Sequence, residues 1–454
     1  MRVAIAGASG FVGRALTARL LNDGNDVIAL SRSVMSSTSM SATYVAVDVG
    51  DESATAVALA NVQCAYYLVH SMAAGAEFRQ MDLRLATTFG RAAAQAGVAR
   101  IVYLGALGSA PNSAHLSSRQ EVGAALGAAG VGVVELRAAV VFGSGSISFE
   151  MLRCLTERLP AMVCPRWVRT RIQPIGLDDL LEYLEQSLSV PSGVYEIGGA
   201  DVTTYRQMIS AYARVRGLRP RRIIDIPWLT PHLSSYWVDF VTPVDRAVSH
   251  ALIESLVTEV IVVDPEPARR AFSVHPVGVE QALAQALDDQ DKQVSSALLS
   301  RCQGLHDGVH TVVVDVRIPS ADVVPIARDL EAIGGDYRWY GCAWGWALRL
   351  ALGRLLGEHL RLQRPHLVVA GATVDWWRIT RSEPGELILR SVGWFPGDAW
   401  LGYRVSGGSL RQVAAFRPLG IPGFLYWRLL GPIHLVVFRR MARHRLRRMR
   451  CMAR

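Results

Sequence analysis

Short apolar runs alternate with stretches of helical spacing along the N-terminal part of the chain. The apolar runs, each typical of a buried strand, occupy residues 3–6, 27–30, 44–47, 64–69, 100–104 and 132–137. Between them, apolar residues recur at helical spacing over 14–21, over 77–96 and from about Leu116. Strands that alternate with helices predict an α/β fold with a doubly wound parallel sheet. Ligands of such a sheet bind beyond the carboxyl ends of its strands.

A glycine-rich turn follows the first apolar run. It reads Gly7-Ala8-Ser9-Gly10-Phe11-Val12-Gly13 and leads into the first helical segment. Glycines permit a tight turn and a close approach of the backbone to phosphate, and a helix N-terminus supplies free N–H groups. The turn therefore predicts a dinucleotide site, and the alternative is that its glycines serve only packing. The predicted contacts are Gly7, Ser9, Gly10, Phe11, Val12 and Gly13.

Residues at the ends of the next strands indicate which dinucleotide binds. Ser31 and Arg32 end the second run, where an acidic residue would bind the ribose 2′-hydroxyl of NAD and an arginine suits the 2′-phosphate of NADP. This end favours NADP(H) over NAD(H), with a solvated loop arginine as the alternative. Asp48 and Val49 follow the third run and His70 the fourth, so all three are further candidates for cofactor contact.

The pattern changes in the second half of the chain. The spacing is mixed from about residue 143, and a first domain is expected over residues 1–287. The polar stretch 288–297 predicts a linker, and a second domain is expected over 298–454. We expect this second domain to be of the α+β class.

The predicted elements of the second domain resemble a known arrangement. A strand over 311–318 precedes helical spacing to about Ala332, and the apolar runs 385–392, 400–405 and 410–416 indicate an antiparallel meander. A helical segment closes the chain. This order resembles the helix-grip or START-like fold, which holds apolar ligands between its sheet and its last helix. The resemblance implies an apolar small-molecule substrate or ligand.

Basic residues gather at the C-terminal end. The formal net charge is +9, and eight arginines follow Phe438, whereas no carboxylate side chain follows Asp398. The excess charge is thus a property of the tail and does not indicate a nucleic-acid-binding surface. The apolar segment 421–438 leaves three interpretations open: a packed terminal helix, a peripheral helix on an anionic membrane, or a spanning helix. Arg428 and Pro432 count against spanning.

Cysteine usage and the N-terminal pattern bear on the compartment. The six cysteines are scattered, without the spacing of a metal knuckle or a redox motif. The first apolar run is short and broken by glycines, unlike a signal peptide. We therefore expect a cytoplasmic protein without a metal site.

Several motifs resemble those of the extended and atypical short-chain dehydrogenase/reductases. They are the glycine turn, the Asp48-Val49 pair, residues 136–143 (LRAAVVFG), and Gln173-Pro174-Ile175 with Asp178-Asp179. Residues 67–72 (YLVHSM) and 103–108 (YLGALG) further resemble a bacterial subgroup of NAD(P)H-binding proteins with a C-terminal domain of unknown function. The resemblance implies a Rossmann fold and NAD(P)H binding, and it is uninformative about the substrate. It also implies that the part of the first domain from about residue 143 builds the substrate side.

The chain departs from this family at the catalytic positions. The family places a Tyr-x-x-x-Lys pair on the helix after the fifth strand, and this chain has His115 and Arg119 there. Because Lys292 is the only lysine, the pair cannot have moved within the first domain. His115 is the candidate for proton exchange and Arg119 a candidate cofactor contact. Two functions stay open. One is an oxidoreductase on an apolar substrate without the usual pair, and the other is a non-catalytic nucleotide-bound redox sensor, assembly protein, or lipid- or partner-binding protein.

Overall fold

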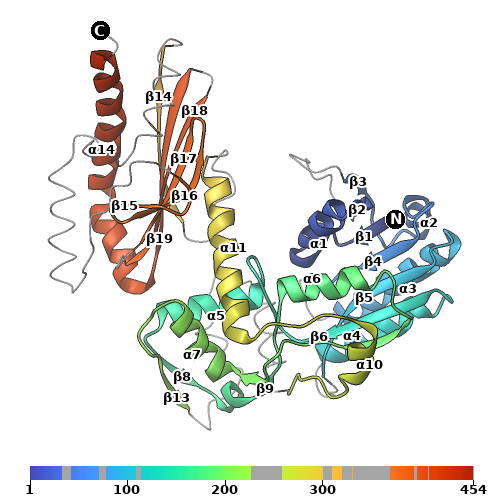
Figure 1. Cartoon of the computed structure of the whole chain (residues 1–454). Coiled ribbons are helices and arrows are strands. Elements are labelled where there is room, and N and C mark those ends of the chain that lie inside the picture. The colour runs from blue at the N-terminus through green and yellow to red at the C-terminus, as the bar shows by residue number, and fades with distance from the viewer. Residues whose placement is uncertain are drawn as a thin grey trace. The chain divides into compact units, whose positions relative to one another are not determined.

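The computed structural model divides the chain into two compact units, Met1–Gln290 (unit 1) and Asp291–Arg454 (unit 2). Figure 1 shows the course of the chain through both units. The residues that the structure describes are 1–32, 42–70, 78–108, 114–225, 258–299, 309–319, 330, 369–392, 396–406 and 408–452.

A seven-stranded parallel sheet forms the framework of unit 1 (Figure 1). Its spatial order is β11-β6-β5-β4-β1-β2-β3, so the order reverses between β1 and β4. Val3, Ala4, Ile5 and Ala6 are fully buried because helices cover both faces of this central strand. The strands are β1 (Arg2–Ala6), β2 (Asp26–Ser31), β3 (Thr43–Ala46), β4 (Cys64–Tyr67), β5 (Arg100–Ala106), β6 (Gly132–Ala138) and β11 (Gly193–Glu196). The predicted doubly wound α/β sheet is confirmed.

Alternate side chains of each strand enter two separate cores. Val3 and Ile5 pack in one core with α1 and α6, while Ala4 and Ala6 pack in the other with α2, α3 and α4. This alternation follows from the two-residue repeat of a strand. The helices are α1 (Phe11–Asn22), α2 (Glu52–Ala58), α3 (Phe78–Gln95), α4 (Ala114–Gly127) and α6 (Leu177–Gln186).

The rest of unit 1 is built from short strands and helices around a third core. Phe149, Tyr212 and Leu283 are fully buried in it and bring α5, α7 and α11 together. The elements are β7 (Val141–Phe142), α5 (Ile147–Arg158), β8 (Ala161–Cys164), a 3-10 turn (Arg166–Arg169), β9 (Arg171–Ile172), β10 (Ile175–Gly176), β12 (Thr203–Thr204), α7 (Tyr205–Val215), β13 (Arg222–Asp225), α10 (Glu266–Ala271) and α11 (Val279–Leu299).

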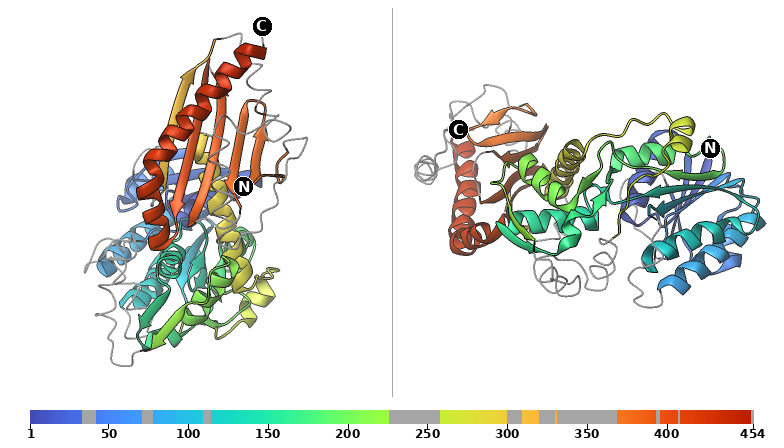
Figure 2. Two further views of the ribbon diagram at one scale, coloured as in Figure 1. Left: turned by 90° about the vertical axis from the view of Figure 1, so that its left-hand side faces the viewer. Right: turned by 90° about the horizontal axis from the view of Figure 1, so that it is seen from below.

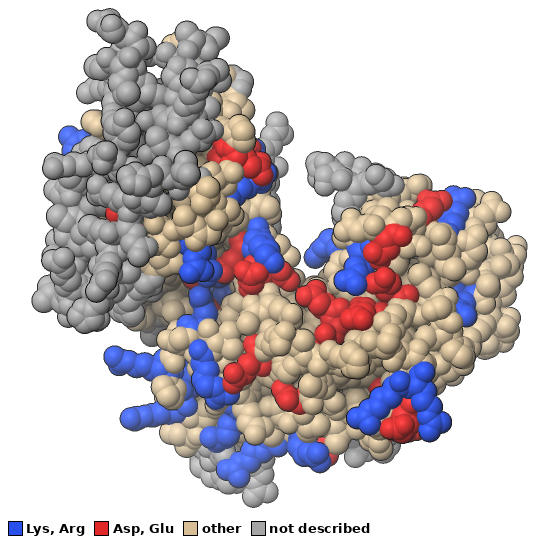
Figure 3. Space-filling model, in the orientation of Figure 1, with Lys and Arg blue, Asp and Glu red and all other residues tan. Residues whose placement is uncertain are grey.

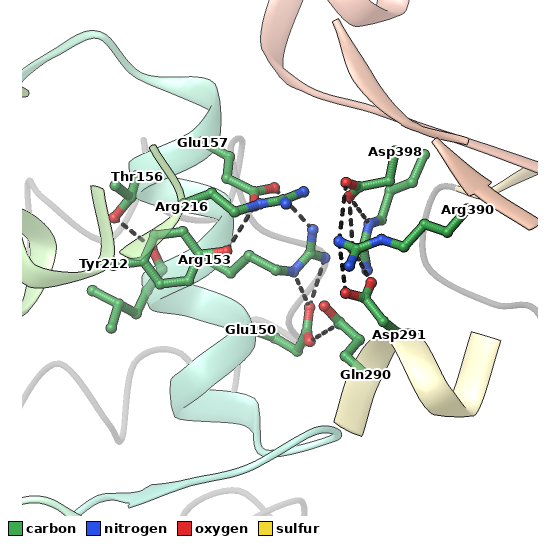
Figure 4. A network of polar contacts seen from close by, with 12 residues as sticks. Glu150, Arg153, Thr156, Glu157, Tyr212, Arg216, Gln290, Asp291, Arg390 and Asp398 are labelled. Atoms are coloured by element: carbon green, nitrogen blue, oxygen red, sulfur yellow. Dashed lines mark hydrogen bonds and ion pairs between the residues drawn. The ribbon is translucent and has the colours of Figure 1, made fainter. Parts of the chain in front are cut away.

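A buried ion-pair network joins α5 and α7 in unit 1 (Figure 4). Arg153 is 5% exposed and contacts Glu150 at 2.6 Å and Glu157 at 3.2 Å. Glu157 also accepts hydrogen bonds from the Tyr212 hydroxyl and the Arg216 guanidinium, at 2.7 and 3.2 Å. The buried Glu157 carboxylate therefore has charged and hydroxyl partners, as buried charges require.

Unit 2 contains a six-stranded antiparallel sheet with the order β14-β19-β18-β17-β16-β15. The strands are β14 (His310–Arg317), β15 (Thr373–Val374), β16 (Trp377–Glu383), β17 (Glu386–Ser391), β18 (Gly397–Ser406) and β19 (Ser409–Pro418). Figure 2 shows the long helix α14 (Gly420–Met452) lying across one face of this sheet. Leu401, Leu410 and Met441 belong to the core between sheet and helix.

The predicted elements of unit 2 are present where the structure describes them. The strand at 311–318, the three-run meander and the closing helix correspond to β14, β17 to β19 and α14. The helix expected up to Ala332 lies outside the described residues except for Leu330, so the START-like assignment stays a prediction. No helix in the described part of the chain has the length and apolarity needed to cross a membrane.

The polar stretch 288–297, expected as a linker, is helical. It lies inside α11, and the boundary between the two units falls between Gln290 and Asp291 within that helix. Asp291 itself is buried and pairs with Arg390 at 2.6 Å (Figure 4) and with Arg417 at 3.5 Å. The polarity of this stretch thus partly reflects ion pairing inside unit 2.

Candidate functional site

The glycine turn joins β1 to α1 at the carboxyl edge of the parallel sheet. Gly7 has a φ of +88°, a left-handed conformation that favours glycine, and the Gly10 N–H donates to its carbonyl at 2.9 Å. A Cβ on Gly13 would lie 2.8 Å from the Cα of Ala8 and closer still to the Gly7 carbonyl oxygen. The absence of a side chain at Gly13 therefore lets α1 begin directly against the turn.

The start of α1 is open to an anionic ligand. Gly10 is the N-cap residue and has no side chain with which to accept a hydrogen bond from the first N–H groups of the helix. Such groups, together with the positive end of the helix dipole, bind phosphate in strand–turn–helix units. The residues of the turn therefore fit the pyrophosphate of a dinucleotide.

The other predicted contacts of the turn have different surroundings. The Ser9 carbonyl accepts a hydrogen bond from the Arg14 guanidinium at 2.6 Å. Phe11 extends towards Gly143, where a Cβ would lie 2.7 Å from the ring. Val12 packs against the core on the α1 side of the sheet. Phe11 and Val12 thus anchor α1 through their side chains, which leaves the backbone of the turn as the part suited to a ligand.

Strand β2 lies next to β1 in the sheet, and β3 lies next to β2. Because the strands are parallel, the carboxyl ends of β2 and β3 lie at the same edge as the glycine turn. Ser31 is the last residue of β2 and is 9% exposed, and the neighbouring Arg32 is exposed. After β3, the Asp48 carboxylate accepts the Gly50 N–H at 2.9 Å and so shapes the turn before α2, while Val49 is buried. The structure thus brings Arg32 and Asp48 to the edge that holds the glycine turn.

The segment after β4 passes over the glycine turn. A Cβ on Gly7 would lie 2.8 Å from the Leu68 carbonyl oxygen and 3.2 Å from the Val69 nitrogen. His70 follows at once, and its Nδ1 lies 3.3 Å from Oδ2 of Asp82 on α3. Asp82 is 2% exposed. Burial lowers the pKa of His70 below its usual range, and the hydrogen bond to Asp82 opposes that shift only in part.

The positions of the missing Tyr-x-x-x-Lys pair lie at the start of α4. The side chain of His115 is outside the described residues, so its predicted role is untested. Arg119 is 9% exposed; its guanidinium donates to the Leu104 carbonyl at the end of β5 and lies over the Tyr103 ring at 5.1 Å. Burial raises the pKa of Tyr103 to about 12, and its hydroxyl donates to the Arg119 carbonyl. Arg119 therefore ties α4 to β5.

Two buried acids near this edge were missed by the reasoning from sequence. One is Asp82, which lies in the segment 77–96 with helical spacing. The sequence marks it only as one polar residue among others on that predicted helix. The other is Glu135 on β6, which is 5% exposed and accepts from the Arg137 guanidinium at 2.7 Å. A Cβ on Gly105 would lie 3.0 Å from the Glu135 carboxylate. Gly105 lies within β5, and its lack of a side chain leaves room for the ion pair of Glu135 with Arg137.

The Gln173-Pro174-Ile175 segment is one of the motifs that resemble the reductase family. Its Gln173 side chain contacts backbone groups elsewhere in unit 1. The Gln173 amide donates to the Gly199 carbonyl at 2.7 Å and accepts from the Val262 N–H at 3.0 Å. Asp179 accepts the Val277 N–H at 3.0 Å, and burial raises its pKa. These side chains position loops near the sheet edge.

Figure 3 shows both basic and acidic side chains on the face that it draws, with basic side chains predominating at the lower left. Among the described residues, no group of three or more histidine, cysteine or acidic side chains is placed to hold a metal ion.

Comparisons with known proteins agree with this geometry. A family model described as NAD(P)H-binding matches residues 7–138, and one described as a protein of unknown function (DUF2867) matches residues 309–441. Unit 1 thus contains an NAD(P)H-binding domain, and unit 2 contains the segment that matches DUF2867. The expected combination of an NAD(P)H-binding domain with a C-terminal domain of unknown function is confirmed.

Relatives with curated sequences are remote. Uncharacterized proteins of Mycobacterium tuberculosis and Mycobacterium bovis are 28% identical over 217 residues, which is 47% of this chain. The match spans 23% of the length of those relatives.

Solved structures share the fold of the N-terminal part. UDP-glucose 4-epimerase of Thermotoga maritima, solved with UDP-glucose, superposes with a TM-score of 0.52 at 14% identity, over 65% of this chain and 100% of the epimerase. The Bordetella bronchiseptica enzyme WbmG, solved with NAD and UDP, gives 0.51 at 17% identity, over 64% of this chain and 96% of the enzyme. At these identities the likeness concerns the fold alone.

Proposed function

We propose that the chain is an NADP(H)-dependent oxidoreductase of the atypical short-chain type, acting on an apolar substrate without the usual tyrosine–lysine pair. The observation that carries the proposal is the glycine turn, with the uncapped start of α1 and the close approach at Gly13. The NAD(P)H-binding family model over residues 7–138 supports it. The substrate class rests on the resemblance of unit 2 to folds that hold apolar ligands.

The proposed preference for NADP(H) rests on the end of β2. Arg32 is exposed there, and Ser31 stands where an NAD-binding protein would have an acid. An arginine can form charge-assisted hydrogen bonds with a 2′-phosphate, which are stronger than neutral ones. The hydroxyl of NAD(H) gives this arginine no charged partner.

We propose His70 as the proton-exchanging group. Bound NADP(H) supplies or accepts the hydride. Since a carboxylate only accepts hydrogen bonds, the contact with Asp82 assigns the Nδ1 proton and makes Nε2 the nitrogen that exchanges a proton with a substrate oxygen. The lowered pKa keeps the imidazole neutral near pH 7, which suits removal of a proton from an alcohol. In the reverse direction, carbonyl reduction, Nε2 first takes up a proton from solvent and then donates it to the carbonyl oxygen. Asp82 is then a positioning residue.

The alternative, a non-catalytic nucleotide-bound protein, is favoured by one observation. Arg119, which replaces the family's lysine, donates to the Leu104 carbonyl. Its guanidinium thus serves the packing of α4 on β5, whereas a catalytic lysine holds the nicotinamide ribose. In this alternative the cofactor acts as a structural element or a redox sensor.

Turnover by the full-length protein distinguishes the two functions. Oxidation of NADPH is followed with a panel of lipophilic aldehydes, ketones and quinones, and NADPH affinity is measured in parallel. His70→Gln should lower kcat about 10²- to 10⁴-fold and leave NADPH affinity unchanged. Asp82→Asn should lower kcat less and move the pH profile. The matched control is His275→Gln, because His275 is exposed.

The outcomes decide between the two functions and test the role of His70. Tight NADPH binding without turnover of any carbonyl or quinone would support the binding protein. Turnover that survives His70→Gln unchanged would remove His70 from the mechanism. A loss of NADPH affinity equal to the loss of turnover would make His70 a cofactor contact only.

A further inference from the structure

Helix α14 has one face on the sheet of unit 2 and one face in solvent. On the inner face, Trp427 stacks on Phe416 at 5.4 Å and on His310 at 5.3 Å, and Met441 is 1% exposed. His434 stacks on Trp427 at 5.8 Å. These contacts fix the rotation of the helix and therefore determine which side chains face outward.

The outward face carries a row of large apolar side chains. Leu425, Leu429, Ile433 and Val436 are separated by three or four residues and so share one face, with Phe424 beside them. Their exposed fractions lie between 50% and 72%. We call these five residues the α14 stripe. Exposed large apolar residues grouped in this way mark a contact surface rather than scattered surface hydrophobes.

Arginines continue the same face towards the C-terminus. Arg439, Arg440 and Arg443 are exposed and follow Val436 by three, four and seven residues, which keeps them on the side of the stripe. Arg428 is exposed within the stripe. The sequence of α14 contains no aspartate or glutamate. The outward face is therefore apolar first, basic next, and has no negative charge.

We propose that α14 docks on an anionic phospholipid surface, with the α14 stripe in the headgroup–acyl boundary and the arginines on the lipid phosphates. Helices that combine an apolar face with arginines lie in the membrane interface and select anionic lipids. The long apolar stem of Arg428 lets its guanidinium reach the headgroups while the neighbouring stripe is inserted. This docking concerns unit 2 and is independent of the chemistry proposed for unit 1.

The charge of the helix selects this occupant over a second copy of the chain. Two α14 helices packed through their stripes would bring their arginines together without an acidic side chain on either helix to pair with them. An anionic bilayer supplies both an apolar layer for the stripe and phosphates for the arginines. A free anion would leave the stripe exposed.

Vesicle binding by the full-length protein tests the proposal. Co-sedimentation is measured with vesicles of phosphatidylcholine alone and of phosphatidylcholine mixed with phosphatidylserine, at low and high salt. We expect binding to the mixed vesicles, weakened by salt, and little binding to phosphatidylcholine. Replacing Arg439, Arg440 and Arg443 together by glutamine should lower the partition coefficient about 100-fold. Leu429→Asp with Ile433→Asp should lower it at least ten-fold.

Control variants on unit 1 make the same kinds of substitution at exposed positions. Val263 is 80% exposed, so Val263→Asp controls for the apolar substitutions. The Arg269 and Arg270 side chains are 72% and 82% exposed, and their joint replacement by glutamine controls for lost charge. Circular dichroism checks that each variant folds. If the double aspartate variant does not fold, the arginine variant still tests the proposal, because it changes only exposed polar side chains.

Three results would overturn the proposal. The first is equal binding to both kinds of vesicle, and the second is an equal loss of binding in the control variants. The third is absence of vesicle binding together with a concentration-dependent dimer that Leu429→Asp dissociates, because a second copy would then cover the stripe.

Discussion

Replacement of Gly13 by alanine tests whether the turn is built for a close approach of backbone to backbone. The new Cβ would lie 2.8 Å from the Cα of Ala8 and 2.9 Å from the carbonyl carbon of Gly7. Real Cβ atoms do not approach so closely, and the neighbours are backbone atoms that cannot rotate away. Overpacking in a core costs about 1–3 kcal/mol, and a backbone clash belongs at the upper end. We therefore expect local destabilisation of about 3 kcal/mol.

The matched substitution is Gly10→Ala. Its Cβ would meet only the Gly7 carbonyl oxygen, at 3.2 Å, which a shift of a few tenths of an ångström relieves. Its main cost is a poorer N-cap, about 1 kcal/mol. The two alanine variants thus add the same atom group to one turn and differ in the expected cost by about threefold.

Amide hydrogen exchange along β1 and α1 is the suitable assay, because a chain of two units need not unfold in a single step. Exchange there should be about 100-fold faster in Gly13→Ala and only a few-fold faster in Gly10→Ala. NADPH affinity should fall in Gly13→Ala because the first N–H groups of α1 are displaced. Exchange in Gly13→Ala that matches the unmodified protein would refute the reasoning.

Two further predictions concern buried charge. Arg153→Met should destabilise the α5–α7 region by about 3 kcal/mol, because Glu150 and Glu157 lose their shared buried partner, whereas Arg269→Met on the surface should have no measurable effect in the same exchange assay. Burial lowers the pKa of His434, so between its folded pKa and about 6.5 the unfolded chain binds the additional proton and stability falls as the pH falls. Chemical denaturation of unit 2 at pH 7 and pH 5 should show a smaller pH effect in His434→Phe.

Local patterns were enough to predict the framework of unit 1. The buried strands are continuous apolar runs. The glycine spacing between a strand and a helix is itself enough to predict a phosphate-binding turn. The two-residue strands between β7 and β12 were not predicted because two residues carry no periodicity. The stretch 288–297 has the composition of a linker because polar residues on a helix resemble those of a loop, and the partners of Asp291 lie about a hundred residues away in the sequence.

The candidate site shows the same division. Gly7, Gly13 and Arg32 follow from the strand–turn–helix pattern, because each acts through its own place in the chain. The contact of His70 with Asp82 joins a loop to a helix, and the donation from Arg119 to Leu104 joins a helix to a strand. Such contacts depend on tertiary packing, which the linear pattern does not contain. The spacing of Arg119 from His115 therefore does not reveal that the Arg119 side chain ties α4 to β5.

Titration of the full-length protein with NADPH and with NADH, in the unmodified chain and in Arg32→Ala, tests the proposed nucleotide site most directly. Charge-assisted hydrogen bonds to a 2′-phosphate are worth about 1.5–3 kcal/mol. We predict tighter binding of NADPH in the unmodified chain, and in Arg32→Ala a loss of about 10- to 100-fold in NADPH affinity with NADH affinity unchanged. Equal affinities for both nucleotides in the unmodified chain, or no binding of either, would contradict the account.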